Sequence, residues 1–154
     1  PWSELLTPEE VEKRWNKHCF NPGFTCFVVV DGEQIIGASW FDTVSREVLI
    51  EERGQELADF ALLVAPNLPV IWVRYTIVDP EFQGRRVASR LKAHVIDEIR
   101  RNSGTAVVLT RMRDDNVKIV RVNESLGFKR TGIKVASKSV PGVVHEYWYL
   151  VIGK

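Results

Sequence analysis

A strand gives way to a helix within residues 78–89, VDPEFQGRRVAS, and the interpretation of the whole chain rests on this joint. Residues 70–78 are rich in β-branched and aromatic side chains, which is typical of a central strand, and Asp79-Pro80 ends it. A helix is predicted from Gln83 to about Arg101, with an apolar stripe at Val87, Leu91, Val95 and Ile99. Because a helix start presents unpaired backbone N–H groups and a positive dipole end, the joint suits a pyrophosphate.

Side chains within the joint agree with phosphate binding. Gly84 and Ala88 are small enough to let a phosphate approach the backbone, and Arg85 and Arg86 add positive charge. The segment is neither a dinucleotide-binding fingerprint nor a Walker loop, because the required glycines and the Lys-Ser/Thr pair are missing. A tight structural connection with no ligand remains the alternative interpretation of these residues.

Local signals on either side of the joint predict the remaining elements. Strands are predicted at 25–30 and 34–40, around the hairpin turn Asp31-Gly32, and at 105–111, 129–138 and 143–152. Further helices are predicted at about 8–19 and from the cap at 114–116 to about Ser125. Residues 43–68 are ambiguous, since 48–50 could be a short strand whereas 55–64 has helical spacing. This order predicts an α/β fold in which helices flank a mixed sheet.

Composition favours one domain that spans residues 1–154. The chain has 45% apolar and 27% charged residues, and its apolar runs fall far short of the roughly 20 residues that cross a bilayer, so a cytoplasmic protein without a membrane partner is expected. Cys19 and Cys26 are too few for a disulfide framework, and no His or Cys cluster has metal-ligand spacing, so no metal is expected.

The formal net charge of +1 hides a strong asymmetry. Residues 1–82 contain 6 Lys/Arg and 14 Asp/Glu, a balance of −8, whereas residues 83–134 contain 13 and 5, a balance of +8. The basic block fits a ligand with several phosphates, but it could also attract nucleic acid. The acidic half could steer a cationic amine towards such a ligand.

Two motifs resemble those of the GNAT superfamily of acyl-CoA-dependent N-acyltransferases. Residues 80–88, PEFQGRRVA, are similar to motif A of this superfamily, Gln/Arg-x-x-Gly-x-Gly/Ala after a strand. Asn116 followed by residues 124–128, ESLGF, is similar to its downstream motif, in which Asn opens a helix that ends in Leu-Gly-Phe. The resemblance covers about residues 70–152 and implies a GNAT-like acyltransferase fold with acetyl-CoA as co-substrate and no metal.

The resemblance also implies where acetyl-CoA would bind. The pantetheine arm and thioester would meet the backbone at the end of the central strand, at Thr76, Ile77 and Val78. The pyrophosphate would be wrapped by the turn and the first helical residues, Gly84, Arg85, Arg86, Val87, Ala88 and Ser89. Asn116 would contact the cofactor from the next helix.

The chain departs from the GNAT pattern at two positions. Arg86 replaces the first glycine of motif A, which is tolerable if that residue has helical backbone angles and points outward. Asn123 stands where many members have the Tyr that protonates the leaving thiolate, and an amide cannot give up a proton near pH 7. Tyr147 or Tyr149 could replace this acid. Candidate bases for the acceptor amine are Glu51, Glu52, Asp79, His145 and Glu146.

The expected activity is N-acetyl transfer to a primary amine of a small molecule or peptide, by direct attack on the thioester. A non-catalytic acyl-CoA-binding or regulatory module is one alternative, and a nucleic-acid-directed acyltransferase is another. A homodimer is a further expectation, although the sequence identifies neither acceptor nor assembly.

Overall fold

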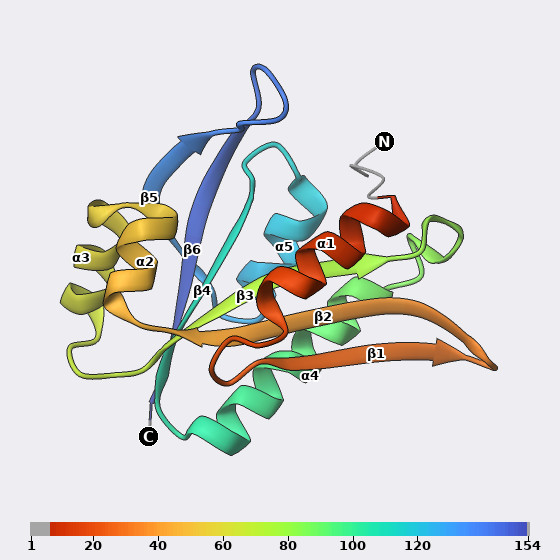
Figure 1. The fold of residues 1–154 in the computed structure, drawn as a ribbon, viewed down its shortest axis with the longest axis horizontal. Helices are drawn as coiled ribbons and strands as arrows, with labels where there is room; N and C mark the ends of the chain where they lie inside the picture. Colours follow the sequence, from red (N-terminus) through yellow and green to blue (C-terminus); the bar gives the residue numbers. More distant parts are fainter. Residues whose placement is uncertain (1–6, 154) are drawn as a thin grey trace.

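The computed structural model describes residues 7–153, which form a six-stranded sheet with helices on both faces (Figure 1). The strands are β1 (Thr25–Asp31), β2 (Gln34–Val44), β3 (Val70–Val78), β4 (Ala106–Arg113), β5 (Lys129–Ala136) and β6 (Val144–Ile152). The helices are α1 (Pro8–His18), α2 (Arg46–Arg53), α3 (Gln55–Val64), α4 (Val87–Ser103) and α5 (Val117–Ser125), with a 3₁₀ turn, η1 (Pro80–Phe82). The predicted α/β fold with a mixed sheet is confirmed.

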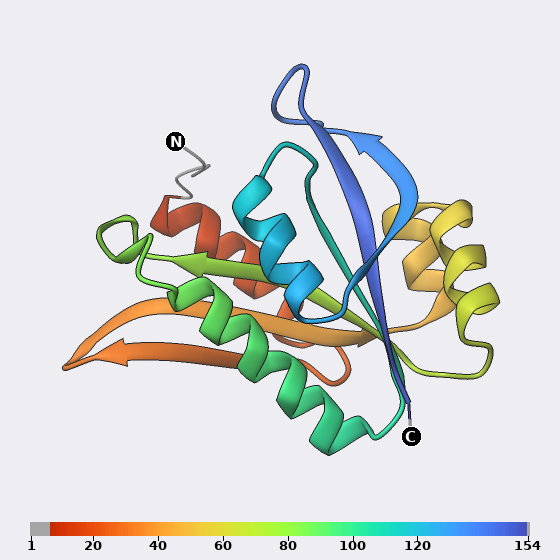
Figure 2. The ribbon, with the colours of Figure 1, turned by 180° about the vertical axis from the view of Figure 1, so that it is seen from behind.

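The strand order is β1-β2-β3-β4-β6-β5, and only the central β3–β4 pair is parallel. Helix α4 connects these two strands, as a parallel pair requires. Helices α1, α2 and α3 lie on one face of the sheet, and α4 and α5 lie on the other (Figures 1 and 2). None of the described helices is long and apolar enough to cross a membrane.

Each face of the sheet has its own apolar core. Val95, Ile96 and Ile99 of α4 pack with sheet residues such as Val108 and Trp148 on one face. Leu49 and Leu57 of α2 and α3 pack with Trp72, Leu109 and Tyr147 on the other. Burying each large apolar side chain stabilises the fold by roughly 1.5–3 kcal/mol, so both layers are fixed to the sheet.

Strands β3 and β4 pair over three residues only and then part. Val70, Ile71 and Trp72 pair with Val107, Val108 and Leu109. Beyond that point β3 stays paired with β2 as far as Val78, and β4 with β6 as far as Arg113. The sheet therefore opens between its two halves, and the edge of β3 that faces β4 is unpaired beyond Trp72 within the described sheet.

A β-bulge lies at this parting point. The β2–β3 register passes from Phe41–Val73 to Trp40–Tyr75 and omits Arg74. Arg74 and Tyr75 consequently both lie on the face covered by α1 and α2, where Arg74 contacts Glu52 and Tyr75 contacts His18. The bulge thus directs the charged side chain of Arg74 into the protein interior, next to the opening between β3 and β4.

Two sequence expectations are corrected. Residues 48–50 belong to α2 and not to a strand, because the Ser45 side chain accepts a hydrogen bond from Val48 N and caps a helix there. Helix α4 begins at Val87 and not at Gln83, because Gly84 and Arg86 have positive φ angles of 80° and 61°, which a right-handed helix excludes. The remaining predicted elements are present with shifted ends, and β2 runs on to Val44.

Candidate functional site: the opening between β3 and β4

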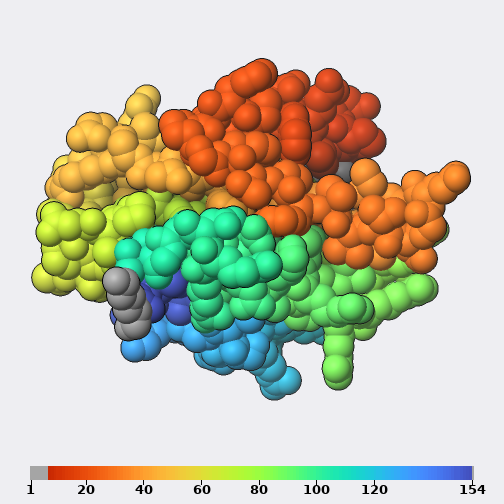
Figure 3. Space-filling model, turned by 90° about the horizontal axis from the view of Figure 1, so that it is seen from below, coloured from red at the N-terminus to blue at the C-terminus, as the bar shows by residue number. Residues whose placement is uncertain are grey.

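The turn between β3 and α4 is exposed at the molecular surface, where a space-filling view shows it in light green (Figure 3). Its side chains are held locally: Gln83 Nε2 donates to Val78 O at 3.3 Å, and the Arg85 guanidinium lies 5.0 Å from the centre of the Phe82 ring. The expectation that Arg86 is helical is wrong, since Arg86 has left-handed angles, φ 61° and ψ 15°. Such angles are unfavourable for a residue with a Cβ atom.

The N-terminus of α4 is not capped by any side chain of the described chain. Helices α1, α2 and α5 have side-chain caps from Thr7, Ser45 and Asn116, respectively. The first turn of α4 also contains no acidic residue. The N–H groups of its first turn are consequently available to an anion, in agreement with the predicted phosphate site.

Gly37 of β2 allows α4 to approach the sheet closely. A Cβ atom at this position would lie 3.2 Å from both Ile77 O and Val87 Cγ1. Gly37 pairs with Val78, so this contact lies directly beneath the first turn of α4. Ile77 and Val78 at the end of β3 thereby lie close to Val87, and Ala88 and Ser89 follow Val87 in the first turn of α4.

Lys92 and Asn123 form a buried pair on the α4–α5 face. Asn123 is fully buried, and its Oδ1 accepts a hydrogen bond from Lys92 Nζ at 2.6 Å. Asn123 Nδ2 faces Met112 Sδ at 3.5 Å, and Met112 lies on β4 beyond the last β3–β4 pair. Burial lowers the pKa of the Lys92 ammonium to about 8. Lys92 therefore gives up its proton readily, and it lies next to Asn123, which stands where many GNAT members have the Tyr that acts as acid.

Sequence reasoning missed Lys92, although a signal was present. Lys92 precedes Ile96 by four residues and Ile99 by seven, so it occupies the buried stripe of α4. In the sequence, Lys92 is one of the 13 Lys/Arg of the basic block of residues 83–134. Only the position of α5 shows that its amine meets Asn123.

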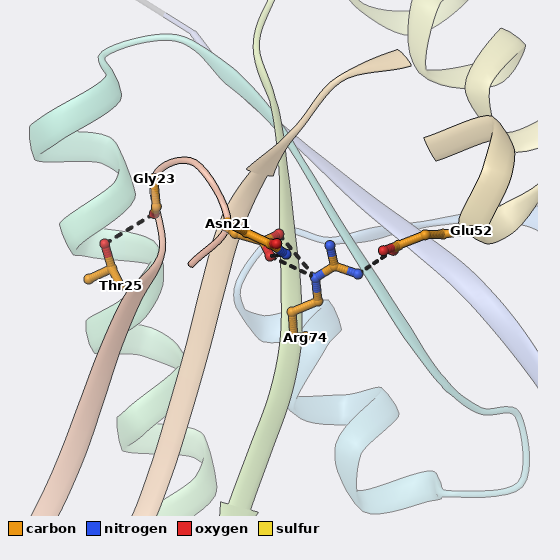
Figure 4. A network of polar contacts seen from close by, with 6 residues as sticks. Asn21, Gly23, Thr25, Glu52 and Arg74 are labelled. Atoms are coloured by element: carbon orange, nitrogen blue, oxygen red, sulfur yellow. Dashed lines mark hydrogen bonds and ion pairs between the residues drawn. The ribbon is translucent and has the colours of Figure 1, made fainter. Parts of the chain in front are cut away.

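Arg74 is the centre of a polar network on the opposite face of the sheet, where it faces Glu52 of α2 (Figure 4). Its Nε donates to both carboxylate oxygens of Asp42, at 3.0 and 3.1 Å, and its Nη1 donates to Glu52 of α2. Asn21 Nδ2 donates to the same Asp42 at 2.6 Å. The Arg74 and Asp42 side chains are 1% and 0% exposed, so this is a buried ion pair that ties the loop after α1 to the sheet.

Glu52 and Tyr147, two predicted catalytic residues, both lie on this face. Burial raises the pKa of the Glu52 carboxyl, but the hydrogen bond and charge of Arg74 oppose this and the pKa is lowered overall. Glu52 is consequently a weak base while it is bound to Arg74. Tyr147 is buried and packs edge-on against Trp72, with ring centres 5.9 Å apart. Tyr147 and Asn123 lie on different faces of the sheet.

Other predicted residues have structural partners. Asn116 caps α5 through Oδ1, which accepts from Ile119 N at 3.2 Å, so only its amide NH₂ is left for a ligand. Asp79 Oδ1 accepts from Glu81 N in η1, and the buried Glu146 pairs with Arg130 at 2.6 Å. Glu51 is exposed. Within residues 7–153, no group of His, Cys, Asp and Glu could hold a metal ion.

Comparisons with known proteins agree with this geometry. A sequence model of the "Acetyltransferase (GNAT) family" matches residues 1–128. A search of curated proteins found no matching sequence. Among solved structures, the ribosomal-protein-S18-alanine N-acetyltransferase of Escherichia coli is similar with a TM-score of 0.66 and 16% identity, over 100% of this chain and 79% of that one.

Two further structures have the same fold. The ribosomal-protein-alanine N-acetyltransferase of Brucella melitensis is similar with a TM-score of 0.65 and 18% identity, over 98% of this chain and 83% of that one. The protein yncA of Salmonella typhimurium, solved with its cofactor acetyl-CoA, is similar with a TM-score of 0.66 and 18% identity, over 100% and 79% of the two chains.

Proposed function

Because the chain belongs to the acetyltransferase (GNAT) family, we propose that it transfers the acetyl group of acetyl-CoA to a primary amine by direct attack on the thioester. One observation carries the proposal. The parallel strands β3 and β4 part after Trp72, and the uncapped start of α4 lies beside the end of β3, above Gly37. An unpaired strand edge and a free helix N-terminus next to each other suit an extended ligand with a pyrophosphate.

In this proposal the N–H groups of Val87, Ala88 and Ser89 bind the pyrophosphate, and Gly84 keeps the turn open. Arg85 and Arg86 contribute positive charge, and Asn116 offers its amide from α5. The pantetheine arm lies along the free edge of β3 at Thr76, Ile77 and Val78, where backbone groups could pair with its amides. The thioester then lies between the two halves of the sheet.

The acceptor would approach from the face that carries Glu52 and Tyr147. The neutral amine forms a bond to the thioester carbonyl carbon, the C–S bond breaks, and the sulfur leaves as a thiolate. Backbone donors at the β3 edge stabilise the oxyanion, and no covalent enzyme intermediate forms.

The buried pair supplies what Asn123 alone cannot. The Asn123 amide donates a hydrogen bond to the leaving thiolate in place of Met112 Sδ, and the Lys92 ammonium gives up the proton. The pKa of Lys92, about 8, lies near that of an ordinary thiol at about 8.5, so the transfer is nearly balanced. The acceptor amine loses one proton as it becomes the amide, and this proton returns Lys92 to its ammonium form.

The test is calorimetric titration of acetyl-CoA, CoA and dephospho-CoA into wild type and Ala88→Asp. A carboxylate in the first turn repels a pyrophosphate, so micromolar binding by the wild type should be lost in the variant. The reaction is then tested by CoA release in the presence of primary amines. Absence of acetyl-CoA binding by the wild type would overturn the proposal.

A second candidate is an acyl-CoA-binding module without turnover. It is favoured by the fully buried Asn123, whose side-chain oxygen is already bound to Lys92. Tight acetyl-CoA binding with no CoA release for any amine tested would identify this module. Such a result would remove the acid role of Lys92 but not the phosphate site.

A further inference from the structure

Two buried polar atoms without a hydrogen-bond partner lie near Trp72 in the described chain. They are Arg53 Nε and Arg74 Nη2, and both guanidinium groups lie near the Trp72 ring, at 4.7 and 6.0 Å from its centre. Folded proteins satisfy nearly all buried donors, with protein groups, water or a ligand. Two unmet cationic donors around one indole therefore point to an anionic partner.

Arg74 cannot turn away to find another acceptor. The bulge fixes its backbone, Asp42 holds Nε, and Glu52 holds Nη1, so Nη2 is left over (Figure 4). Its side chain is only 1% exposed. The remaining donor is consequently preorganised, and an anion that reached it would lose little to reorganisation.

Arg53 is the last residue of α2, and other cations lie near its guanidinium. Burial lowers the pKa of its guanidinium, and the charge of Arg111 lowers it further. Arg53 is influenced by two other cations, Arg74 and Arg111, and by one carboxylate, Glu52, so positive charge is in excess around it. This excess is opposite in sign to the acidic balance of residues 1–82.

Arg53, Arg74 and Trp72 lie on the face of the sheet from which the acceptor is proposed to approach. Trp72 and Leu109 form the last β3–β4 pair, and Arg111 pairs with Tyr147 just beyond it. The Lys92–Asn123 pair lies on the other face of the sheet. A group bound beside Trp72 would therefore lie across the opening from the proposed site of the thiolate.

We propose that the acceptor amine carries a carboxylate, and that this carboxylate binds beside Trp72 to the free N–H groups of Arg53 and Arg74. The inference rests on the proposed function and specifies its acceptor. Arginine guanidinium groups bind carboxylates with charge-assisted hydrogen bonds. The excess positive charge also disfavours the ammonium form of the acceptor, which favours the neutral amine that attacks.

The first experiment compares amines that differ only in this charge. The rate of CoA release is measured with glycine, β-alanine and 4-aminobutyrate, each against its amide, and with the dipeptide Ala-Asp against Ala-Asn for a peptide acceptor. In at least one pair, kcat/KM should favour the carboxylate by about 10-fold or more, as expected for a charge-assisted hydrogen bond. The free amino acids and the dipeptides distinguish the two sources of the carboxylate.

Variants of two arginines on α2 provide the control. Arg53→Met should abolish the preference, and Arg53→Lys should retain part of it, because the charge remains without the Nε donor. Arg46→Met should leave it unchanged, since Arg46 pairs with Asp59 at the surface, where the two side chains are 39% and 56% exposed, respectively. Arg74 is unsuitable, because its loss would leave Asp42 buried without a partner.

A second readout needs no turnover. Succinate at millimolar concentration should raise the Tm of the wild type and Arg46→Met above that in succinamide, and should not do so for Arg53→Met. Equal Tm values and equal rates for acids and amides would overturn the inference and show that the free donors bind only water. If acetyl-CoA also failed to bind, the proposed function would fail separately, because succinate binding does not depend on it.

Discussion

Lys92 is a buried cation that donates a hydrogen bond to the neutral side-chain amide of Asn123. In the described chain, no carboxylate pairs with it, and the Phe128 ring, 5.9 Å from Nζ, is its other charge-stabilising neighbour. Burial of an unpaired ammonium costs free energy, and because this cost falls on the charged form, the pKa is lowered. The buried ammonium of Lys92 therefore lowers the stability of the fold, and the proposed function gives it a role as proton donor.

Replacing Lys92 by Met is expected to change how stability depends on pH. The folded-state pKa of about 8 lies below the ordinary value of 10.5, so the unfolded chain binds the lysine proton more strongly. The free energy of unfolding of the wild type should consequently rise between these two pH values, by roughly 3 kcal/mol relative to Lys92→Met. Urea unfolding of both proteins from pH 7 to 10.5 measures this. A difference that stays constant across the range would contradict the lowered pKa.

Arg86 has left-handed backbone angles at the start of α4, where motif A has glycine. Arg86→Gly should raise the free energy of unfolding by about 0.5–1 kcal/mol, because glycine adopts these angles without strain but loses more entropy on folding. Arg86→Ala should give no such gain, since alanine retains the strain. If the Arg86 charge helps to bind the pyrophosphate, both variants should weaken acetyl-CoA binding equally. Urea unfolding and calorimetry measure the two effects, and an equally stable pair of variants would count against the strain.

At the level of elements, the position of α4 depends on one glycine in β2. Gly37→Ala would place a methyl group 3.2 Å from Ile77 O and from Val87 Cγ1, so the first turn of α4 must move outward by a few tenths of an ångström. Acetyl-CoA affinity should fall by about 10-fold, whereas the fold should remain, because the core beneath the rest of α4 is unchanged. Calorimetry and circular dichroism distinguish these outcomes. The matched control is Gly153→Ala, whose added Cβ has no neighbour within 4 Å and whose backbone does not require glycine.

Local signals were sufficient for most elements. Asp31-Gly32 marked the first hairpin, Asn116 marked the start of α5, and the stripe through Leu91 and Val95 marked α4. Residues 43–68 are ambiguous in the sequence because their two short helices, α2 and α3, meet at Gly54, and Leu49 is the only buried residue of α2. The length of such helices leaves too few turns for a clear period.

The candidate site was only partly predictable, because some of its parts are contiguous in the sequence and others join residues far apart in it. The joint at 78–89 is contiguous, so the helix start and its small residues could be predicted from the sequence. The pairs Lys92–Asn123 and Arg74–Asp42 join residues 31 and 32 positions apart, and no local pattern indicates such a pair. The bulge at Arg74 is equally invisible, since it depends on the register against β2.

At the level of the whole molecule, the basic block of residues 83–134 is partly neutralised by local ion pairs. These pairs are Arg100–Asp97, Arg101–Glu98, Arg113–Asp115, Arg130–Glu146 and Lys134–Asp114. Lys92 is buried and faces no solvent. Of the seven remaining cations, Arg85, Arg86 and Arg90 lie together at the start of α4, whereas Arg111, Lys118, Arg121 and Lys129 are spread over β4, α5 and β5. The group at the start of α4 suits one small polyanion.

Polynucleotide binding should therefore be weak and only slightly dependent on salt. A polynucleotide held by many phosphate contacts loses affinity steeply with salt, whereas one held only by the three arginines at the start of α4 would show a shallow slope. Fluorescence anisotropy with labelled single-stranded RNA and double-stranded DNA of about 20 nucleotides, from about 50 to 200 mM salt, measures both quantities. Whatever binding occurs should be displaced by CoA, because the same arginines serve the pyrophosphate. Tight binding with a steep slope that CoA does not displace would instead favour a nucleic-acid-directed acyltransferase and require a second basic surface outside the α4 start.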